Sequence, residues 1–126
     1  MCRQCMAMIT AILVATLTLQ SAPTVRWTLL NDEHEDKVYY ATEETGGLNP
    51  IVWFRVDLAR PESGIGTTVS RIEIDCAKRR TRQGQTTAYA GPGTTGYSQT
   101  WDGVEPWEYA VPDSNMDDVL RAVCRA

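Results

Sequence analysis

Residues with the chemistry of a catalyst are few in this 126-residue chain. Its one histidine, His34, stands among polar and acidic side chains in residues 31–36. A Ser-His-Asp arrangement needs an imidazole that a partner orients, and a polar turn between strands holds a side chain poorly. The carboxylates of this segment suit calcium, but the glycine and the last glutamate of an EF-hand loop are missing. We therefore expect a solvated turn, without a catalytic residue or a metal ion.

Two carboxylates at alternate positions, Glu73 and Asp75, are a second arrangement that suggests chemistry. Glycosidases use two carboxyl groups that flank the scissile bond. Arg71, however, falls on the same face of the expected strand, and opposite charges on an exposed sheet face explain the pattern without catalysis. A hydrolase of cell-wall or glycan substrates is our third hypothesis, and it needs a cleft with a carboxylate of perturbed pKa. The sequence predicts no enzyme and no cofactor.

Two features favour binding. A basic cluster follows the same strand and consists of Lys78, Arg79, Arg80 and Arg82. Clustered cations capture anionic partners, such as a glycan sulfate or an acidic protein surface, although a solvated hairpin end is the more common explanation. Trp53 is expected on the sheet face opposite the apolar row, where an exposed aromatic ring is typical of a binding surface unless a loop covers it. These five are the candidate binding residues.

The charge of the chain limits its partners. The formal net charge is −4, whereas binding to nucleic acid or to anionic membranes needs a broad basic surface. We therefore expect no nucleic acid as a partner. A protein or an anionic glycan is the expected macromolecular partner, and a homodimer through an edge strand is an alternative.

The first residues predict a cleaved signal peptide. Arg3 precedes residues 6–19, a run without charge, and residues 20–23 offer small side chains for cleavage. The uncharged run is shorter than the about twenty apolar residues that a transmembrane helix needs. We expect a signal peptide over residues 1–22, one domain over residues 23–126, and a periplasmic or extracellular protein without a membrane span.

Removal of the leader leaves Cys76 and Cys124 as the cysteines of the mature chain. An exported protein meets conditions that permit disulfides. A reactive thiol pair would need an activating neighbour and usually a Cys-x-x-Cys spacing, and the sequence has neither. We therefore predict one structural disulfide between Cys76 and Cys124.

Strand-favouring segments separated by turn residues predict a sheet of about six strands, and apolar and polar residues alternate in two of them, over residues 51–58 and 71–76. The expected strands cover residues 25–30, 37–42, 51–58, 71–76, 86–90 and 97–101. In the fourth strand Ile72, Ile74 and Cys76 share one face, which should turn towards the core. Residues 59–68, with their proline and glycines, are expected to form a long loop, and Gly84 is expected in a hairpin turn.

The C-terminal residues predict a helix. Ser114 is a favourable N-cap, with acidic residues in the first turn. Apolar side chains recur at helical spacing and make one stripe that ends at Cys124. The sequence thus predicts an α+β fold, in which an antiparallel sheet of about six strands carries one C-terminal helix tied to it by the disulfide.

These segments resemble the bacterial surface-adhesin protein E family. The resemblance rests on their order: a signal sequence, Val-Tyr-Tyr at 38–40, Val-Trp-Phe-Arg-Val at 52–56, Ile-Asp-Cys with basic residues at 74–80, Val-Pro-Asp-Ser at 111–114 after a late tryptophan, and a helix that closes on Val-Cys at 123–124. It covers about residues 25–125.

The resemblance implies an antiparallel sheet with a C-terminal helix, a disulfide and no catalytic machinery. Named members of the family bind host extracellular-matrix proteins, and dimerisation is implied as well. The named adhesin type is lipid-anchored, whereas no cysteine stands directly after the apolar run here to carry such an anchor. We expect a non-enzymatic envelope protein that binds a macromolecular partner. The alternative is a structural or accessory envelope protein without a ligand of its own.

Overall fold

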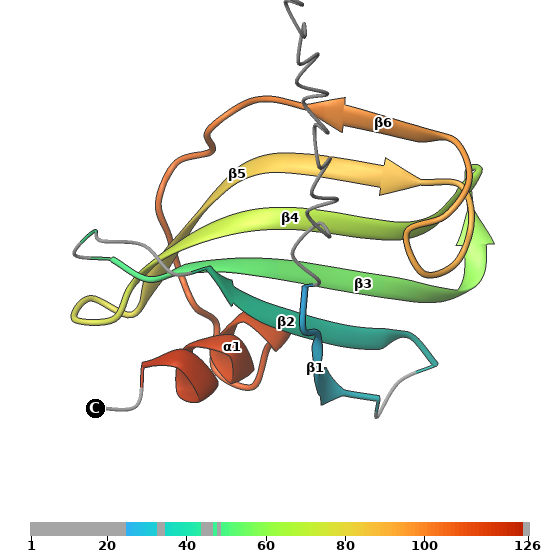
Figure 1. The fold of residues 1–126 in the computed structure, drawn as a ribbon. Coiled ribbons are helices and arrows are strands. Elements are labelled where there is room, and N and C mark those ends of the chain that lie inside the picture. Colours follow the sequence, from blue (N-terminus) through green and yellow to red (C-terminus); the bar gives the residue numbers. More distant parts are fainter. Residues whose placement is uncertain (1–24, 33–34, 44–46, 48, 125–126) are drawn as a thin grey trace, which may run out of the picture.

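In the part of the chain that the structure describes, one antiparallel sheet carries a helix on one of its faces (Figure 1). The computed structural model of the protein describes residues 25–32, 35–43, 47 and 49–124. The elements are β1 (Thr28–Asn31), β2 (Lys37–Glu43), β3 (Ile51–Glu62), β4 (Ile65–Asp75), β5 (Arg80–Tyr89), β6 (Ser98–Trp101), β7 (Glu108–Tyr109) and α1 (Asn115–Val123). The predicted fold class is confirmed.

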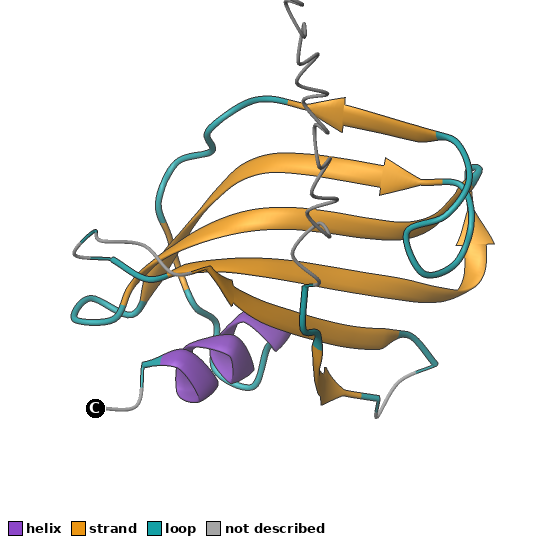
Figure 2. Ribbon diagram, viewed as in Figure 1, coloured by secondary structure: helices purple, strands orange, loops and turns teal. Residues whose placement is uncertain are grey.

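The sheet follows the order of the chain. Each strand from β1 to β6 pairs antiparallel with the next, and the short β7 lies off this path beside the first residues of β5. In Figure 2, β1 and β6 form the two edges of the sheet, and α1 lies below β2 at one end of the strands. Such sequential pairing needs only short connections.

The prediction of a long loop over residues 59–68 is wrong. Strand β3 continues to Glu62 and β4 begins at Ile65, so only Ser63 and Gly64 turn the chain. Both have positive φ, 51° and 78°, as a two-residue hairpin turn of the I′ type requires. Pro61 is tolerated in β3 because the strand pairing is irregular there: the paired residues pass from Asp57–Thr67 directly to Glu62–Ile65. A residue within such an irregularity does not need a backbone N–H for the hydrogen bonds of the sheet.

The prediction of a hairpin turn at Gly84 is also wrong. Strand β5 runs through Gly84, and the chain turns instead at residues 76–79. Asp75 stabilises that turn, because its Oδ1 accepts a hydrogen bond from the backbone N–H of Lys78 at 3.2 Å. The pairing of β4 with β5 shifts register between Ser70 and Ile72, and Gly84 lies in this bulge, where glycine is common.

The core lies where α1 packs on the sheet. Val52 on β3 meets Ile72 and Ile74 of β4 and Val119 and Leu120 of the helix, and these five residues form one buried cluster. The side chains of Cys76 and Cys124 pack against it and form the predicted disulfide, with their Cα atoms 5.5 Å apart. The bridge therefore fastens the end of the helix to the end of β4.

The first turn of the helix is held by the buried carboxylate of Asp117. Ser114 is the N-cap, as predicted, and its Oγ accepts the backbone N–H of Asp117 at 3.2 Å. The side chain of Asp117 accepts hydrogen bonds from the backbone N–H of Asp113 at 3.0 Å, from Arg79 at 2.5 Å and from Arg121. Asp117 is only 3% exposed, and these donors compensate the burial of its charge.

No helix within the described ranges is long and apolar enough to cross a membrane. The expected signal peptide, residues 1–22, lies outside the described residues. The division of the chain into a leader and one domain therefore stays a prediction.

Loss of the disulfide should weaken the fold. The bridge joins residues separated by 48 positions, and a loop of that length stabilises by up to about 4 kcal/mol in the chain-entropy description. We expect reduction, or the double substitution Cys76→Ser/Cys124→Ser, to lower the free energy of unfolding in urea by several kcal/mol. Non-reducing peptide mapping of the mature protein checks the linkage itself, and two free thiols would contradict it.

Acid should weaken the attachment of the helix through Asp117. The pKa of Asp117 lies below its ordinary value of 3.8, because the Asp113 N–H and Arg121 donate to its ionised carboxylate. An acid whose pKa falls on folding stabilises the fold above its unfolded pKa, and this contribution is lost as the pH falls through the folded pKa. We expect Asp117→Asn to be less stable than the wild type at pH 7.

The difference in unfolding free energy between the two proteins should then narrow below about pH 4, where Asp117 of the unfolded chain begins to take up a proton, and it should vanish as the pH falls through the lower pKa of the folded state. Urea unfolding at several pH values measures it. The pKa values of Glu43, Glu73 and Asp75 are lowered as well, so both proteins lose stability in acid and only their difference reports on Asp117. A difference that is constant with pH would exclude a role for its charge.

Candidate functional site

The helix covers one face of the sheet, and we call the opposite face the open face. The strand register places Trp53 there, between Ala41 of β2 and Arg71 of β4. This agrees with the expectation that Trp53 lies opposite the apolar row that begins at Val52. The open face also carries the following side chains: Tyr39, Glu43, Arg55, Asp57, Thr67, Val69, Glu73, Asp75, Arg80, Arg82, Thr87 and Tyr89.

A cavity of about 390 Å³ opens beside Trp53 on this face. Its lining is mainly aromatic and aliphatic and consists of Val25, Trp27, Trp53, Val69, Tyr89 and Thr94. Thr94 belongs to the connection between β5 and β6, which therefore reaches over the open face. The sequence left open whether Trp53 is exposed at a binding surface or covered by a loop. Trp53 is half-buried: its ring is partly covered, and it also lines the cavity.

Arg55 fixes one side of this cavity. Its guanidinium lies 5.5 Å from the ring centre of Trp27 and 4.8 Å from that of Tyr39. It also donates two hydrogen bonds to Asp57, at 2.7 and 2.6 Å. This pairing raises the pKa of Arg55 above its usual value. A cation held by a carboxylate and by two aromatic faces keeps the Trp27 ring in place before any partner arrives.

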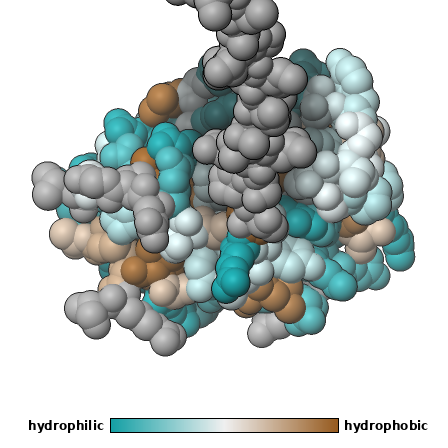
Figure 3. All heavy atoms as spheres, viewed as in Figure 1, coloured by the Kyte–Doolittle hydropathy of each residue, from teal (hydrophilic) through white to brown (hydrophobic). Residues whose placement is uncertain are grey.

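Several other charges of the open face are compensated in pairs. Arg71 binds Glu43 with hydrogen bonds of 3.1 and 3.2 Å, and this contact lowers the pKa of Glu43. Figure 3 shows one side of the molecule, on which hydrophobic residues gather only in small, separate areas between hydrophilic ones. On the open face, the aromatic cavity is a feature that offers apolar contact to a partner.

The basic cluster is mostly engaged by carboxylates. Arg79 binds Asp117 at 2.5 Å, Arg80 binds Asp75 at 3.0 Å and Arg82 binds Glu73 at 2.5 Å. The structure thus brings Arg80 and Arg82 onto the open face, whereas Arg79 turns to the helix and holds its first turn. Lys78 is exposed, and its ammonium group has no ion pair among the described residues. A binding role of the cluster stays a prediction.

Trp107 joins Arg80 and Arg82 into one unit. Both guanidinium groups lie 4.6 Å from the centre of its ring. Because each arginine is also paired with a carboxylate of β4, the connection between β6 and β7 is anchored to the open face through an aromatic ring between two ion pairs. This stack lies at the opposite end of the strands from the Arg55–Asp57 pair.

The carboxylates of the hydrolase hypothesis are Glu73 and Asp75. Hydrogen bonds from Arg82 and Asn49 lower the pKa of Glu73, and the backbone N–H of Lys78 together with Arg80 lowers that of Asp75. A glycosidase needs one carboxylic acid whose pKa is raised so that it can donate a proton. Both groups stay ionised here, so this pair lacks the general acid.

A metal site finds no support in the described residues, since no group of three or more His, Cys, Asp or Glu side chains there is placed to hold an ion. His34 lies outside the described residues, so the expectations for its turn are not tested. Two described carboxylates of that region are engaged elsewhere: Asp36 accepts the backbone N–H of Ala59 at 2.9 Å, and Glu35 lies 3.6 Å from Arg60.

Sequence reasoning missed Trp27, Tyr89 and Trp107. Their strands or connections were expected, but the pairing that brings Trp27 and Tyr89 to Trp53 depends on register across the sheet. The position of Trp107 beside the arginines could have been expected from the charge of its segment, because residues 101–113 contain four acidic and no basic side chains. A segment rich in carboxylates is suited to lie beside the arginines that follow β4.

Comparisons with known proteins agree with this architecture. A family model described as surface-adhesin protein E matches residues 27–125. A crystal structure of Haemophilus influenzae protein E is similar in fold, with a TM-score of 0.60 and 12% sequence identity. The alignment covers 69% of this chain and 79% of that protein. A search of curated proteins finds no match.

At 12% identity the likeness to that structure concerns the fold. The family model carries the assignment, because it spans the sheet, the aromatic cavity and the helix together. This chain belongs to the surface-adhesin protein E family.

Proposed function

We propose that this protein is an exported, non-enzymatic binding protein of the bacterial envelope, and that its open face engages a protein partner. The observation that carries the proposal is the cavity between Trp27, Trp53 and Tyr89. Tryptophan and tyrosine supply much of the energy at protein interfaces, where they are packed centrally and surrounded by polar groups. Membership of an adhesin family supports a binding role.

The ion pairs favour a protein over an anionic glycan. A sulfated glycan is captured by cations that are free to meet it, but each arginine of the basic cluster already has a carboxylate partner. A polyanion would have to displace these carboxylates. A protein surface instead offers aliphatic and aromatic side chains for the cavity, and its polar groups can match a rim whose charges are balanced.

Export is part of the proposal. The predicted leader and the disulfide fit a protein that leaves the cytoplasm, because structural disulfides persist mainly in oxidising compartments. The bridge between β4 and the helix is present in the structure. We place the protein in the periplasm or at the cell exterior, and fractionation of the bacterium distinguishes the two.

A structural envelope protein without a ligand is the second candidate. The observation in its favour is the edge strand β6, all of whose residues are exposed. An exposed edge can pair with a second copy of the chain. A structural protein of this kind would not bind a partner through the aromatic cavity. The effect of a Trp53 substitution on partner binding therefore distinguishes the two candidates.

The test is capture by the immobilised mature domain. It is offered a bacterial envelope extract and a mixture of extracellular-matrix proteins, and the proteins retained are identified by mass spectrometry. With a purified partner, we expect Trp53→Ala to weaken binding roughly 30-fold, the loss of about 2 kcal/mol expected for a central aromatic residue. Tyr97→Ala is the matched control, because Tyr97 is 78% exposed and does not line this cavity.

The basic cluster needs a separate variant. Arg79→Ala removes a hydrogen bond to the buried Asp117, so it tests the stability of the helix rather than a contact with a partner. Lys78→Ala removes an exposed charge without breaking an ion pair, and we expect it to change binding less than threefold, as for a screened surface charge. Equal losses for Trp53→Ala and Tyr97→Ala, or a greater loss for Lys78→Ala, would contradict the proposal.

A further inference from the structure

A groove lies on the face of the sheet that carries the helix, along the part of this face that the helix does not cover. Two cavities of about 390 and 410 Å³ share Gln83 and Glu105, and so they adjoin. The register places Thr81 and Gln83 of β5 opposite the core residues Ile74 and Ile72, so the groove follows β5 outwards from the helix. The chain around residues 101–108 forms its outer wall, and Met116 of α1 closes its inner end.

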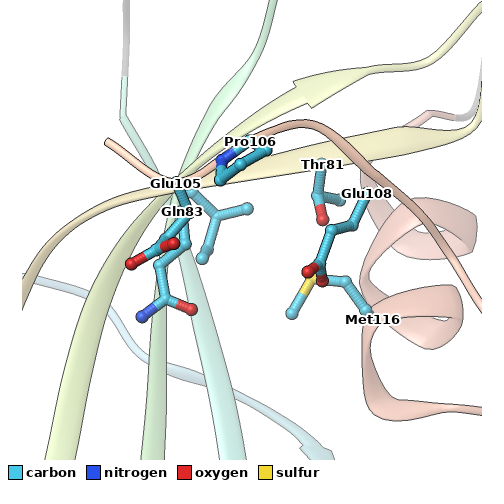
Figure 4. A pocket seen from close by; sticks show the side chains of 7 residues that line it. Thr81, Gln83, Glu105, Pro106, Glu108 and Met116 are labelled. Atoms are coloured by element: carbon cyan, nitrogen blue, oxygen red, sulfur yellow. The ribbon is translucent and has the colours of Figure 1, made fainter. Parts of the chain in front are cut away.

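Figure 4 shows the inner half of this groove. Gln83 and Glu105 lie together on one side of the cavity, and Thr81, Glu108 and Met116 lie together on the other. Glu105 is attached to the strand by its backbone, because its N–H donates to the carbonyl oxygen of Gln83 at 2.8 Å. Its carboxylate is therefore carried on a fixed piece of chain at the junction of the two cavities.

The groove has an acidic rim and apolar contacts between the charges. Asp102, Glu105 and Glu108 line it, and none of the three has an ion pair in the described part of the chain. The apolar contacts come from Ile72, Pro106 and Met116 in the inner half and from Trp101 in the outer half. Trp101 is 48% exposed, so its ring is available to a partner.

The charge of this groove differs from that of the open face. On the open face the arginines and carboxylates are paired, as for Arg82 with Glu73. Residues 101–113 contain four acidic and no basic side chains, and the whole chain has a formal net charge of −4. Asp113 pairs with Arg121 at 3.3 Å, so the negative charge without an ion pair among the described residues of this segment is that of Asp102, Glu105 and Glu108. A groove lined by charge of one sign attracts ligands of the opposite sign.

We propose that this groove binds an extended, basic segment of a protein. The three rim carboxylates occupy every third position along the chain, Asp102, Glu105 and Glu108. They are not gathered into a site for one metal ion, since no such group occurs among the described residues. Carboxylates spaced along a groove pair instead with lysine or arginine side chains spaced along a peptide, whose apolar residues meet Trp101, Pro106 and Met116.

This groove and the aromatic cavity of the open face lie on opposite faces of the sheet. The two proposals therefore stand separately, and each can fail without the other. A partner that used both would have to reach around an edge of the sheet.

The probe for the groove is the capped peptide Lys-Val-Ser-Lys-Val-Ser-Lys, whose lysines repeat at the spacing of the rim carboxylates. It is titrated into the isotopically labelled mature domain, and amide chemical shifts are followed by NMR. We expect saturable shifts over residues 81–86 and 101–108, and weaker binding at raised salt, because salt screens exposed charges. The same peptide with glutamate in place of lysine should produce no such shifts.

Glu105→Gln and Glu108→Gln each remove one charge and keep the shape of the side chain. We expect each to weaken binding of the lysine peptide roughly fivefold, which corresponds to about 1 kcal/mol for a partly exposed ion pair. Glu62→Gln is the matched control, since Glu62 is an exposed residue of the β3–β4 hairpin that does not line the groove. All three variants should keep the wild-type melting temperature.

Three results would overturn the proposal. The first is an equal loss of affinity for Glu62→Gln, which would show attraction to the net charge alone. The second is a set of shifts that maps to the open face. The third is the absence of saturable shifts with the lysine peptide at millimolar concentration.

Discussion

The buried carboxylate of Asp117 is the interaction on which the rest of the structure depends. It lies in the first turn of the helix and receives hydrogen bonds from the chain before the helix, from Arg121 within it and from Arg79 in the turn after β4. A buried charge is tolerated only when such donors surround it. One ion therefore joins the helix to the β4–β5 turn, and the disulfide from Cys76 to Cys124 joins the same two parts at the other end of the helix. The helix is thus fixed at both of its ends.

This fixed helix determines what the two faces of the sheet can do. It covers the apolar ends of β3 and β4 and leaves the opposite face free for charge pairs and for the aromatic cavity. Arg79 pairs with Asp117 of the helix, while Arg80 and Arg82 are held by β4 carboxylates and by Trp107. The basic cluster is in this sense part of the architecture. The rings around Trp53 offer apolar contact on the open face.

The fold was largely predictable because its signals are local. Alternation in β3 and β4 and the cap at Ser114 each lie within a few residues. The pairing of Cys76 with Cys124, 48 positions apart, followed from the expected removal of the leader, and the family resemblance joins these segments in order. The two errors, at residues 59–68 and at Gly84, concern turns. There, glycine and proline mark an irregularity inside a strand as readily as a loop between strands, and only cross-strand pairing decides between them. The site was harder to predict for the same reason, since the rings around Trp53 come from strands distant in sequence.

The central claim is that the open face engages a protein, and site-specific photo-crosslinking in the living bacterium tests it most directly. A photoreactive amino acid replaces Val25, which lines the aromatic cavity and is 53% exposed, or Val111, which is 67% exposed and does not line it. We predict a covalent adduct with a second protein from position 25 and none from position 111. Adducts from position 111 alone, or from neither position, would contradict the account.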